Sequence, residues 1–177
     1  MTIICAKDGV IAADGSVWMD ELTFSTRKKI RQLGDGALVG AAGDAEYADA
    51  FMLWKQGKCG KPDVPPDDSN FAAIEINKEG IFQYAGNYTR FSDIAPFAAI
   101  GSHAEFAMGL MDAGMSAEQA VWRCIERGAW ARGPVQVERV EGWVDKVSDR
   151  RDVGAGGQGC GQPWLDPVGG VQVRDRG

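Results

Sequence analysis

The chain has 177 residues, 45% of them hydrophobic, with a formal net charge of −6 and one histidine. This length predicts one domain with at most an appendage, and the acidic charge disfavours a nucleic-acid partner, which would select a basic surface. No apolar run reaches the roughly 18 residues that a membrane span needs, and no secretory leader opens the chain. One histidine excludes a two-histidine metal motif. We therefore expect a cytoplasmic protein without metal, cofactor or membrane contact.

The first segment begins with Met1-Thr2 and continues as an apolar, β-prone run. Removal of Met1 would leave an α-amino group and a hydroxyl on Thr2. Such an amine can take the hydroxyl proton as the oxygen attacks a carbonyl, and its ordinary pKa of about 7.7–8.0 suits a base near neutral pH. Thr2 is therefore a candidate nucleophile. The alternative is an ordinary residue at the start of a strand.

Residues 2–6 and 10–13 are apolar runs joined by an Asp-Gly turn, which predicts a hairpin. A two-residue turn would place Gly15 opposite Thr2 and turn Asp14 to the other face of the sheet. A three-residue loop or a bulge would place Asp14 directly across from Thr2. We predict the loop or the bulge, because Asp14 is a candidate partner of the site. A tight two-residue turn without a bulge would count against the site.

The middle of the chain alternates between predicted strands and helices. Residues 37–42 predict a buried strand that stops at Gly43, and Asp44 is the expected cap of a helix that runs to Lys55. Three prolines predict a loop over residues 57–70. Further strands are predicted over residues 71–76 and 80–84, as a second hairpin, and over residues 96–100.

Two helices and a strand follow. The first helix, from residue 103, is expected to end at Gly114, and Ser116 with Gln119 predicts a capping box at the start of the second. Residues 135–140 alternate as a strand. Residues 143–177 are Gly-rich and poor in apolar side chains, which predicts a flexible tail. Its G-x-G-x-x-G run lacks a preceding strand, so we reject a dinucleotide site.

The four cysteines are scattered, which predicts reduced thiols, two of them in the core, instead of a disulfide framework or a zinc site. They are Cys5, Cys59, Cys124 and Cys160.

These segments, in this order, resemble the β-type proteasome subunits and the bacterial HslV-type peptidases. The matching stretches are TIICAKDGVIAADG, TRKKIRQL, ALVGAAGDAEYADAFMLW, AAIGSHAEFAMGLMDAGMSAEQAV and ARGPVQVERV. The resemblance covers roughly residues 2–141. It implies an α+β fold, the four-layer αββα sandwich of N-terminal nucleophile hydrolases, for a domain over residues 1–142.

The resemblance also implies roles for five residues. Thr2 would be the nucleophile and its amine the base. Lys29 would carry a positive charge beside the hydroxyl and keep the amine neutral, and Asp14 would hold Lys29 by a charge-assisted hydrogen bond. Gly43 would offer its N–H to the oxyanion, and Ser102 would lie near the amine.

Each role has a structural alternative. Lys29 could be a solvated surface charge, Asp14 a turn residue, and Gly43 a glycine that a strand-to-helix junction requires. We prefer Lys29 to Lys28 because the family lysine directly precedes an aliphatic residue, and neighbours on a strand face opposite ways.

The sequence departs from the family pattern at the residues that orient the amine. The family has an aspartate and a serine before a Gly-Gly turn, and Gly128 and Ala131 stand at these positions. The glycine that follows the family serine is His103 here.

The resemblance implies a threonine-type endopeptidase that cleaves unfolded polypeptides inside a homo-oligomeric ring. The helices at 44–55 and 103–127 would be its packing surfaces. Because the chain has no P-loop, unfolding would need a separate ATPase partner. Gly128 and Ala131 favour an alternative, an inactive scaffold or assembly protein, and a third reading is an amidohydrolase that acts on a small amide.

Overall fold

The computed structural model describes residues 2–18, 24–66, 69–92, 96–128 and 131–144. Its strands are β1 (Ile3–Lys7), β2 (Val10–Ala13), β3 (Ser16–Trp18), β4 (Phe24–Thr26), β5 (Ile30–Gln32), β6 (Leu38–Ala42), β7 (Ala72–Asn77), β8 (Gly80–Ala85), β9 (Thr89–Ser92), β10 (Phe97–Gly101) and β11 (Gln136–Arg139). Its helices are α1 (Ala45–Lys55), α2 (Ala104–Asp112) and α3 (Ala117–Glu126). The predicted tail lies outside the described residues, apart from its first two positions.

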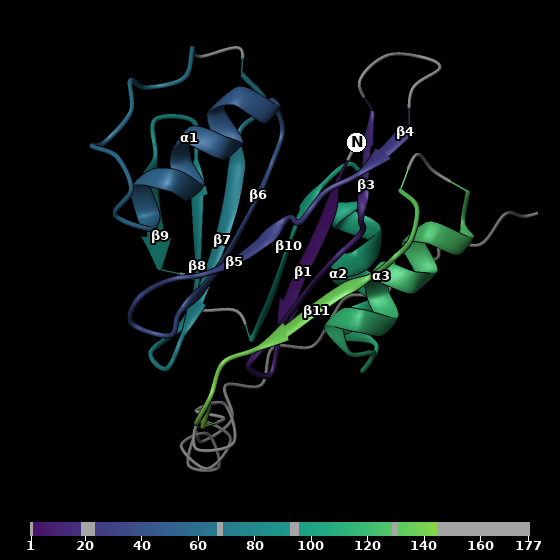
Figure 1. The fold of residues 1–177 in the computed structure, drawn as a ribbon. Helices are drawn as coiled ribbons and strands as arrows, with labels where there is room; N and C mark the ends of the chain where they lie inside the picture. Colours follow the sequence, from purple (N-terminus) through teal and green to yellow (C-terminus); the bar gives the residue numbers. More distant parts are fainter. Residues whose placement is uncertain (1, 19–23, 67–68, 93–95, 129–130, 145–177) are drawn as a thin grey trace, which may run out of the picture. The chain divides into compact units, whose positions relative to one another are not determined.

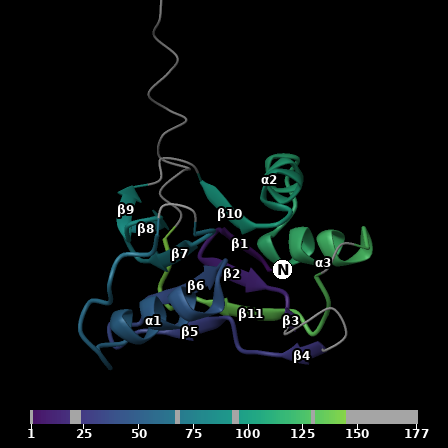
Figure 2. The same ribbon diagram turned by 90° about the horizontal axis from the view of Figure 1, so that it is seen from above.

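Two antiparallel sheets form the centre of the described domain. One has the order β10-β1-β2-β11 and the other the order β5-β6-β7-β8-β9, while β3 and β4 form a separate pair. Helix α1 lies over the second sheet, and α2 and α3 lie on the opposite side, against the first sheet (Figures 1 and 2). The predicted αββα sandwich is therefore present.

The alternation along β1 shows why its first four residues are apolar. Ile4 and Ala6 pack between the two sheets, whereas Ile3 and Cys5 pack against α2 and α3. A strand buried on both faces needs apolar residues at every position, and all four of these side chains are fully buried. The end of β1 that carries Thr2 is therefore anchored in both cores.

An aromatic cluster fixes α1 on its sheet. The Phe51 ring lies 5.1 Å from the Phe71 ring, 4.9 Å from the Tyr84 ring and 5.4 Å from the Tyr88 ring, measured between centroids. Such pairs contribute about 0.5–1.5 kcal/mol each beyond the burial of apolar area. Asp44 occupies the cap position of α1 as predicted, but its side chain makes no capping hydrogen bond.

The other predicted elements are confirmed, with the capping box the most specific of them. Ser116 accepts a hydrogen bond from the Gln119 N–H, and the Gln119 side chain accepts one from the Ser116 N–H. Gly114 has a φ of 97°, as expected for the residue that ends α2. The pair β3 and β4, strand β5 and the edge strand β9 were not predicted.

The predicted register of the first hairpin is wrong. Lys7 pairs with Val10 and Ile4 with Ala13, so the connection is a two-residue turn without a bulge. Its residues, Asp8 and Gly9, have φ values of 50° and 74°, as in the type I′ turn that Asp-Gly favours. Asp14 therefore stands opposite Ile3, one residue away from the predicted position.

Within the described residues, no helix is long and apolar enough to cross a bilayer, and no group of His, Cys, Asp and Glu side chains could hold a metal ion. Cys5 and Cys124 are buried free thiols, and Cys59 is exposed. Cys160 lies outside the described part of the chain.

Candidate active site

Lys29 joins two of the other predicted site residues. Its Nζ donates to Thr2 Oγ1 at 2.9 Å and to Asp14 Oδ1 at 2.8 Å. The Lys29 side chain is 5% exposed and the Asp14 side chain is fully buried. Lys28 instead points to Glu138 at 3.4 Å and is exposed. The geometry therefore gives Thr2 a close ammonium neighbour in a poorly solvated place.

The Asp14 carboxylate is saturated with donors. Oδ1 accepts from the Ile3 N–H at 2.9 Å and from Lys29 Nζ, and Oδ2 accepts from the Ser16 N–H at 3.1 Å and from the Ser16 hydroxyl. A carboxylate offers about four lone-pair sites, so these donors occupy its capacity. Asp14 can hold and charge-balance Lys29, but it has no free position from which to accept a proton from Thr2.

The hydrogen bond from Ile3 explains how the site forms despite the wrong register. Asp14 lies one residue beyond the end of β2, and its N–H donates to the Ile3 carbonyl oxygen at 3.2 Å. The carboxylate turns along the edge of the sheet to the Ile3 N–H. Lys29 then bridges from Asp14 to the neighbouring residue, Thr2.

Ser16 is a site residue that the sequence reasoning missed. Its N–H and hydroxyl both bind Asp14 Oδ2, and its oxygen accepts from the Arg132 N–H at 3.1 Å. The serine thus links the aspartate to the chain that follows α3. The spacing Asp-x-Ser is a signal for this turn, because an aspartate often accepts the N–H two residues later.

Burial lowers the pKa of Lys29, and the positive charge of Arg27 lowers it further. The Asp14 carboxylate acts in the opposite direction through its charge and hydrogen bond. The net effect lowers the pKa of Lys29, because removing an ammonium from water disfavours its charged form.

Ser102 and Gly101 hold the backbone of Thr2. The Ser102 N–H donates to the Thr2 carbonyl oxygen at 3.0 Å, and the Ser102 hydroxyl lies 3.5 Å from the same oxygen. A Cβ on Gly101 would lie 1.9 Å from that oxygen, so only glycine permits this approach. Ser102 is therefore beside the Thr2 carbonyl, and His103 Nδ1 lies 3.4 Å from its hydroxyl.

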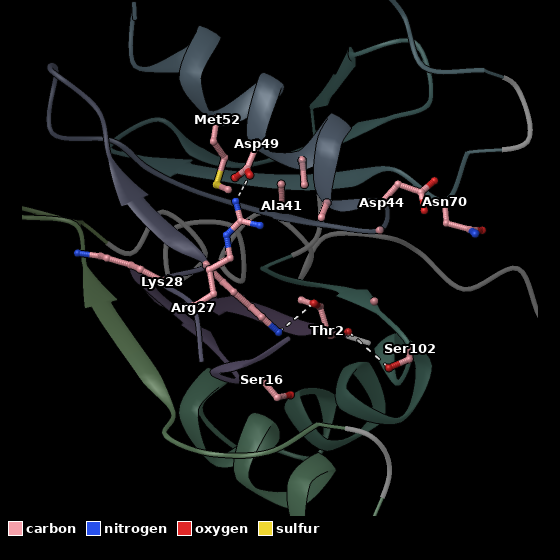
Figure 3. A pocket seen from close by; sticks show the side chains of 15 residues that line it. Thr2, Ser16, Arg27, Lys28, Ala41, Asp44, Asp49, Met52, Asn70 and Ser102 are labelled. Carbon is pink, nitrogen blue, oxygen red and sulfur yellow. Dashed lines mark hydrogen bonds and ion pairs between the residues drawn. The ribbon is translucent and has the colours of Figure 1, made fainter. Parts of the chain in front are cut away.

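A pocket of about 680 Å³ opens beside Thr2. Figure 3 shows Thr2 and Ser102 on one side of it, and Ala41, Asp49 and Met52 on the other. The pocket has an apolar floor where Ala41 and Met52 meet the core under α1. It is large enough to accept a side chain of a bound polypeptide.

Gly43 lines the same pocket at the junction of β6 and α1. Its φ is 102°, and a Cβ there would lie 2.0 Å from the Asn70 carbonyl oxygen. The structural reason for a glycine is therefore present alongside the proposed oxyanion role. The nearby start of α1 carries the partial positive charge of a helix N-terminus, which favours an anion in this part of the pocket.

The charged wall of the pocket is formed around Asp49. This carboxylate forms ion pairs with Arg27 and with Arg31, the second at 3.2 Å. The pairs connect α1 to the segment that leads into β5 and carries Lys29.

Gly128 and Ala131 do not contribute polar groups. Gly128 follows the end of α3 with a φ of 80° and is exposed. Ala131 is 2% exposed and packs in the apolar cluster beneath α2 and α3.

The fold is shared with solved peptidase structures. BPH from Thiobacillus denitrificans aligns with 22% identity over 80% of this chain and 98% of that chain, with a TM-score of 0.55. BPH in complex with epoxomicin gives 20% identity, 78% and 98% coverage and a TM-score of 0.54. Eukaryotic HslV from Trypanosoma brucei gives 18% identity, 78% and 98% coverage and a TM-score of 0.57.

The chain has the fold of HslV and BPH. This agrees with the sandwich and with the family resemblance predicted from the sequence. No protein-family model matches the chain, and no curated protein is similar to it in sequence. At these low identities the solved structures show a shared fold only. The chemistry follows from the geometry of the site.

Proposed function

We propose that this protein is a threonine-type endopeptidase subunit with Thr2 as its nucleophile. The observation that carries the proposal is Lys29 Nζ, which lies 2.9 Å from Thr2 Oγ1 and 2.8 Å from the buried carboxylate of Asp14. A buried ammonium beside a hydroxyl favours the developing alkoxide. A lysine with only a structural role would need the carboxylate but not the threonine.

In the proposed reaction, removal of Met1 frees the Thr2 amine. Thr2 Oγ1 attacks the substrate carbonyl carbon while its proton passes to this amine through a water molecule. The oxyanion is stabilised at Gly43 and the start of α1. The carbon–nitrogen bond then breaks, the leaving amine takes the proton, and water hydrolyses the ester on Thr2. Lys29 stays protonated throughout, and Asp14 keeps it in place.

We further propose a self-assembled, cytoplasmic homo-oligomeric ring as the working form, with unfolded polypeptide as substrate and a separate ATPase to supply it. The HslV-type fold of the neighbours supports this proposal. A ring also confines an endopeptidase site that would otherwise reach folded cellular proteins.

The scaffold alternative rests on Gly128 and Ala131, whose positions offer no side-chain hydrogen bond to the amine. Intact mass spectrometry separates the two. We expect the mature chain to lack Met1, because a retained methionine would block the amine.

A fluorogenic peptide panel with epoxomicin as inhibitor should then show cleavage that the compound abolishes, with one adduct per chain on the Thr2 peptide. A mature chain that keeps Met1 and cleaves none of the peptides supports the scaffold; turnover of a small amide alone supports the amidohydrolase.

The activity should fall at alkaline pH as Lys29 loses its proton. Since burial and Arg27 lower the pKa of Lys29, the alkaline limb of kcat/KM should lie below the ordinary lysine range. Arg27→Gln removes one cause of the lowering, so the limb should move to higher pH. The measurement is a pH–rate profile from about pH 7 to 11 at constant ionic strength.

Lys28→Gln is the matched control, because it removes the neighbouring charge, which is exposed and pairs with Glu138. We expect its alkaline limb to stay in place. A limb that moves to lower pH in Arg27→Gln would contradict the assignment of Lys29 as the titrating cation.

A further inference from the structure

The backbone that carries Lys29 lies outside the strands, so the expectation that Lys28 and Lys29 are neighbours on a strand is wrong. In this segment the Arg27 N–H donates to the Gly15 carbonyl oxygen at 2.9 Å. Residues 27–29 lie between β4 and β5 and belong to neither strand. The Lys29 ammonium must nevertheless reach two partners, at 2.8 and 2.9 Å. A lysine side chain is a flexible four-carbon stem, so the place of its tip depends on how firmly its backbone is fixed.

Gln136 binds this segment at both ends. Its side-chain oxygen accepts from the Lys29 N–H at 2.7 Å, and its side-chain nitrogen donates to the Arg27 carbonyl oxygen. The acceptor and the donor of this one amide lie 107 and 109 residues, respectively, from their partners in sequence. One side chain therefore binds two backbone groups of this segment.

The position of Gln136 ties this segment to the other half of the site. Gln136 begins β11 and pairs with Ala13 of β2, and Ala13 is followed by Asp14. Ala13 in turn pairs with Ile4 of β1, the strand that begins after Thr2. The amide thus joins the sheet that bears Thr2 and Asp14 to the backbone of Lys29 itself, whereas the Arg27 N–H joins the start of the segment to Gly15.

We propose that Gln136 is a positioning residue that fixes the Lys29 backbone so that the ammonium lies between Thr2 and Asp14. It touches no reacting atom, and it acts through Lys29. Its importance for catalysis rests on the proposed function, whereas its effect on the placement of Lys29 does not.

Glu138 provides a matched control on the same strand. It lies two residues from Gln136 and contacts the same segment, but through the exposed Lys28 side chain at 3.4 Å. Glu138→Gln therefore removes a contact between β11 and this segment and leaves both backbone hydrogen bonds intact.

The test is trace labelling of the full-length protein with an amine-reactive reagent, read for each lysine by mass spectrometry. Lys29 is 5% exposed and should react slowly in the wild type. In Gln136→Met, which keeps the length but neither hydrogen bond, we expect Lys29 to react at least about ten-fold faster. Lys7, held by the Met111 carbonyl at 2.8 Å, reports whether the fold is intact. Glu138→Gln should leave the Lys29 rate unchanged.

Gln136→Glu is the second variant, because it keeps an acceptor for the Lys29 N–H and loses the donor to Arg27. We expect a smaller rise than in Gln136→Met, and this variant decides the question if Lys7 shows that Gln136→Met is unfolded. Equal protection of Lys29 in a folded variant and in the wild type overturns the proposal.

Kinetics provide the second readout. In Gln136→Met, kcat should fall about 100-fold through misplacement of Lys29, with KM close to the wild-type value. A rise in KM at constant kcat would place Gln136 in substrate binding and overturn the proposal. If the wild type cleaves no peptide, the proposed function fails, and the labelling alone decides the role of Gln136.

Discussion

Thr2→Ala should reduce peptide turnover at least about 1,000-fold, because removal of the nucleophile of a hydrolase leaves only the contributions of binding and oxyanion stabilisation. Lys29 retains its hydrogen bond to Asp14 in this variant, so the fold should remain. The measurement is kcat/KM with a fluorogenic peptide, together with particle size by light scattering.

Thr2→Ser is the control for this substitution. It keeps a hydroxyl within reach of Lys29 Nζ and should retain activity. Unchanged turnover in Thr2→Ala, with no contaminating peptidase, would refute the mechanism. A loss of particle size would instead assign Thr2 a part in assembly.

Asp14→Asn should destabilise the fold by about 3–5 kcal/mol near neutral pH, because it leaves a buried ammonium without its counter-charge. Asp14 is fully buried and Lys29 nearly so. The variant should also lose most of its activity. The measurement is urea unfolding of the wild type and the variant, from which the difference in unfolding free energy is obtained.

The loss in Asp14→Asn should depend on pH in one direction. The burial penalty falls on protonated Lys29, whose folded pKa lies below its ordinary value. A lowered pKa means that stability is gained as pH rises through the folded value, so the gap between variant and wild type should narrow at alkaline pH. The double variant Asp14→Asn with Lys29→Met should recover stability but not activity. Failure to recover would show that Asp14 acts through Ser16 and Ile3 instead of Lys29.

Much of the fold was predictable because short apolar runs in the sequence indicate which strands are buried. Residues 3–6 and 37–42 have no polar side chain since both faces of β1 and β6 are covered. The capping box at Ser116 is a local signal that needs no tertiary information. By contrast, β9 is a four-residue edge strand, TRFS, whose pairing with β8 leaves little pattern to detect.

The register error has a local cause. Asp-Gly favours a two-residue type I′ turn, and the prediction of a bulge set this signal aside in order to bring Asp14 across from Thr2. It assumed that the Asp14 side chain follows the strand pleat. Instead, Asp14 lies beyond the strand end and turns to the Ile3 N–H, a contact that sequence spacing does not encode.

Gln136 was missed for a related reason, whereas the Asp-x-Ser spacing offered a local signal for Ser16. Gln136 binds backbone groups more than 100 residues away, and backbone groups have no residue type that a pattern could recognise. The sequence could nominate Thr2 from the chemistry of its side chain, and Lys29 and Asp14 from the family resemblance. It could not reveal the backbone contacts through which Gln136 holds the segment of Lys29.

Helix α1 lines the pocket on one side and Thr2, which leads into strand β1, lines it on another. The helix and the strand are anchored very differently. Strand β1 is interior to its sheet, paired with β10 on one edge and β2 on the other, whereas α1 is a single outer layer attached mainly through Phe51 and its aromatic neighbours. Detachment of α1 alone would cost far less than extraction of β1. Warming should therefore weaken substrate binding at a lower temperature than the one at which Thr2 leaves its place beside Lys29. Cooling should restore activity as long as the inner strands have not separated.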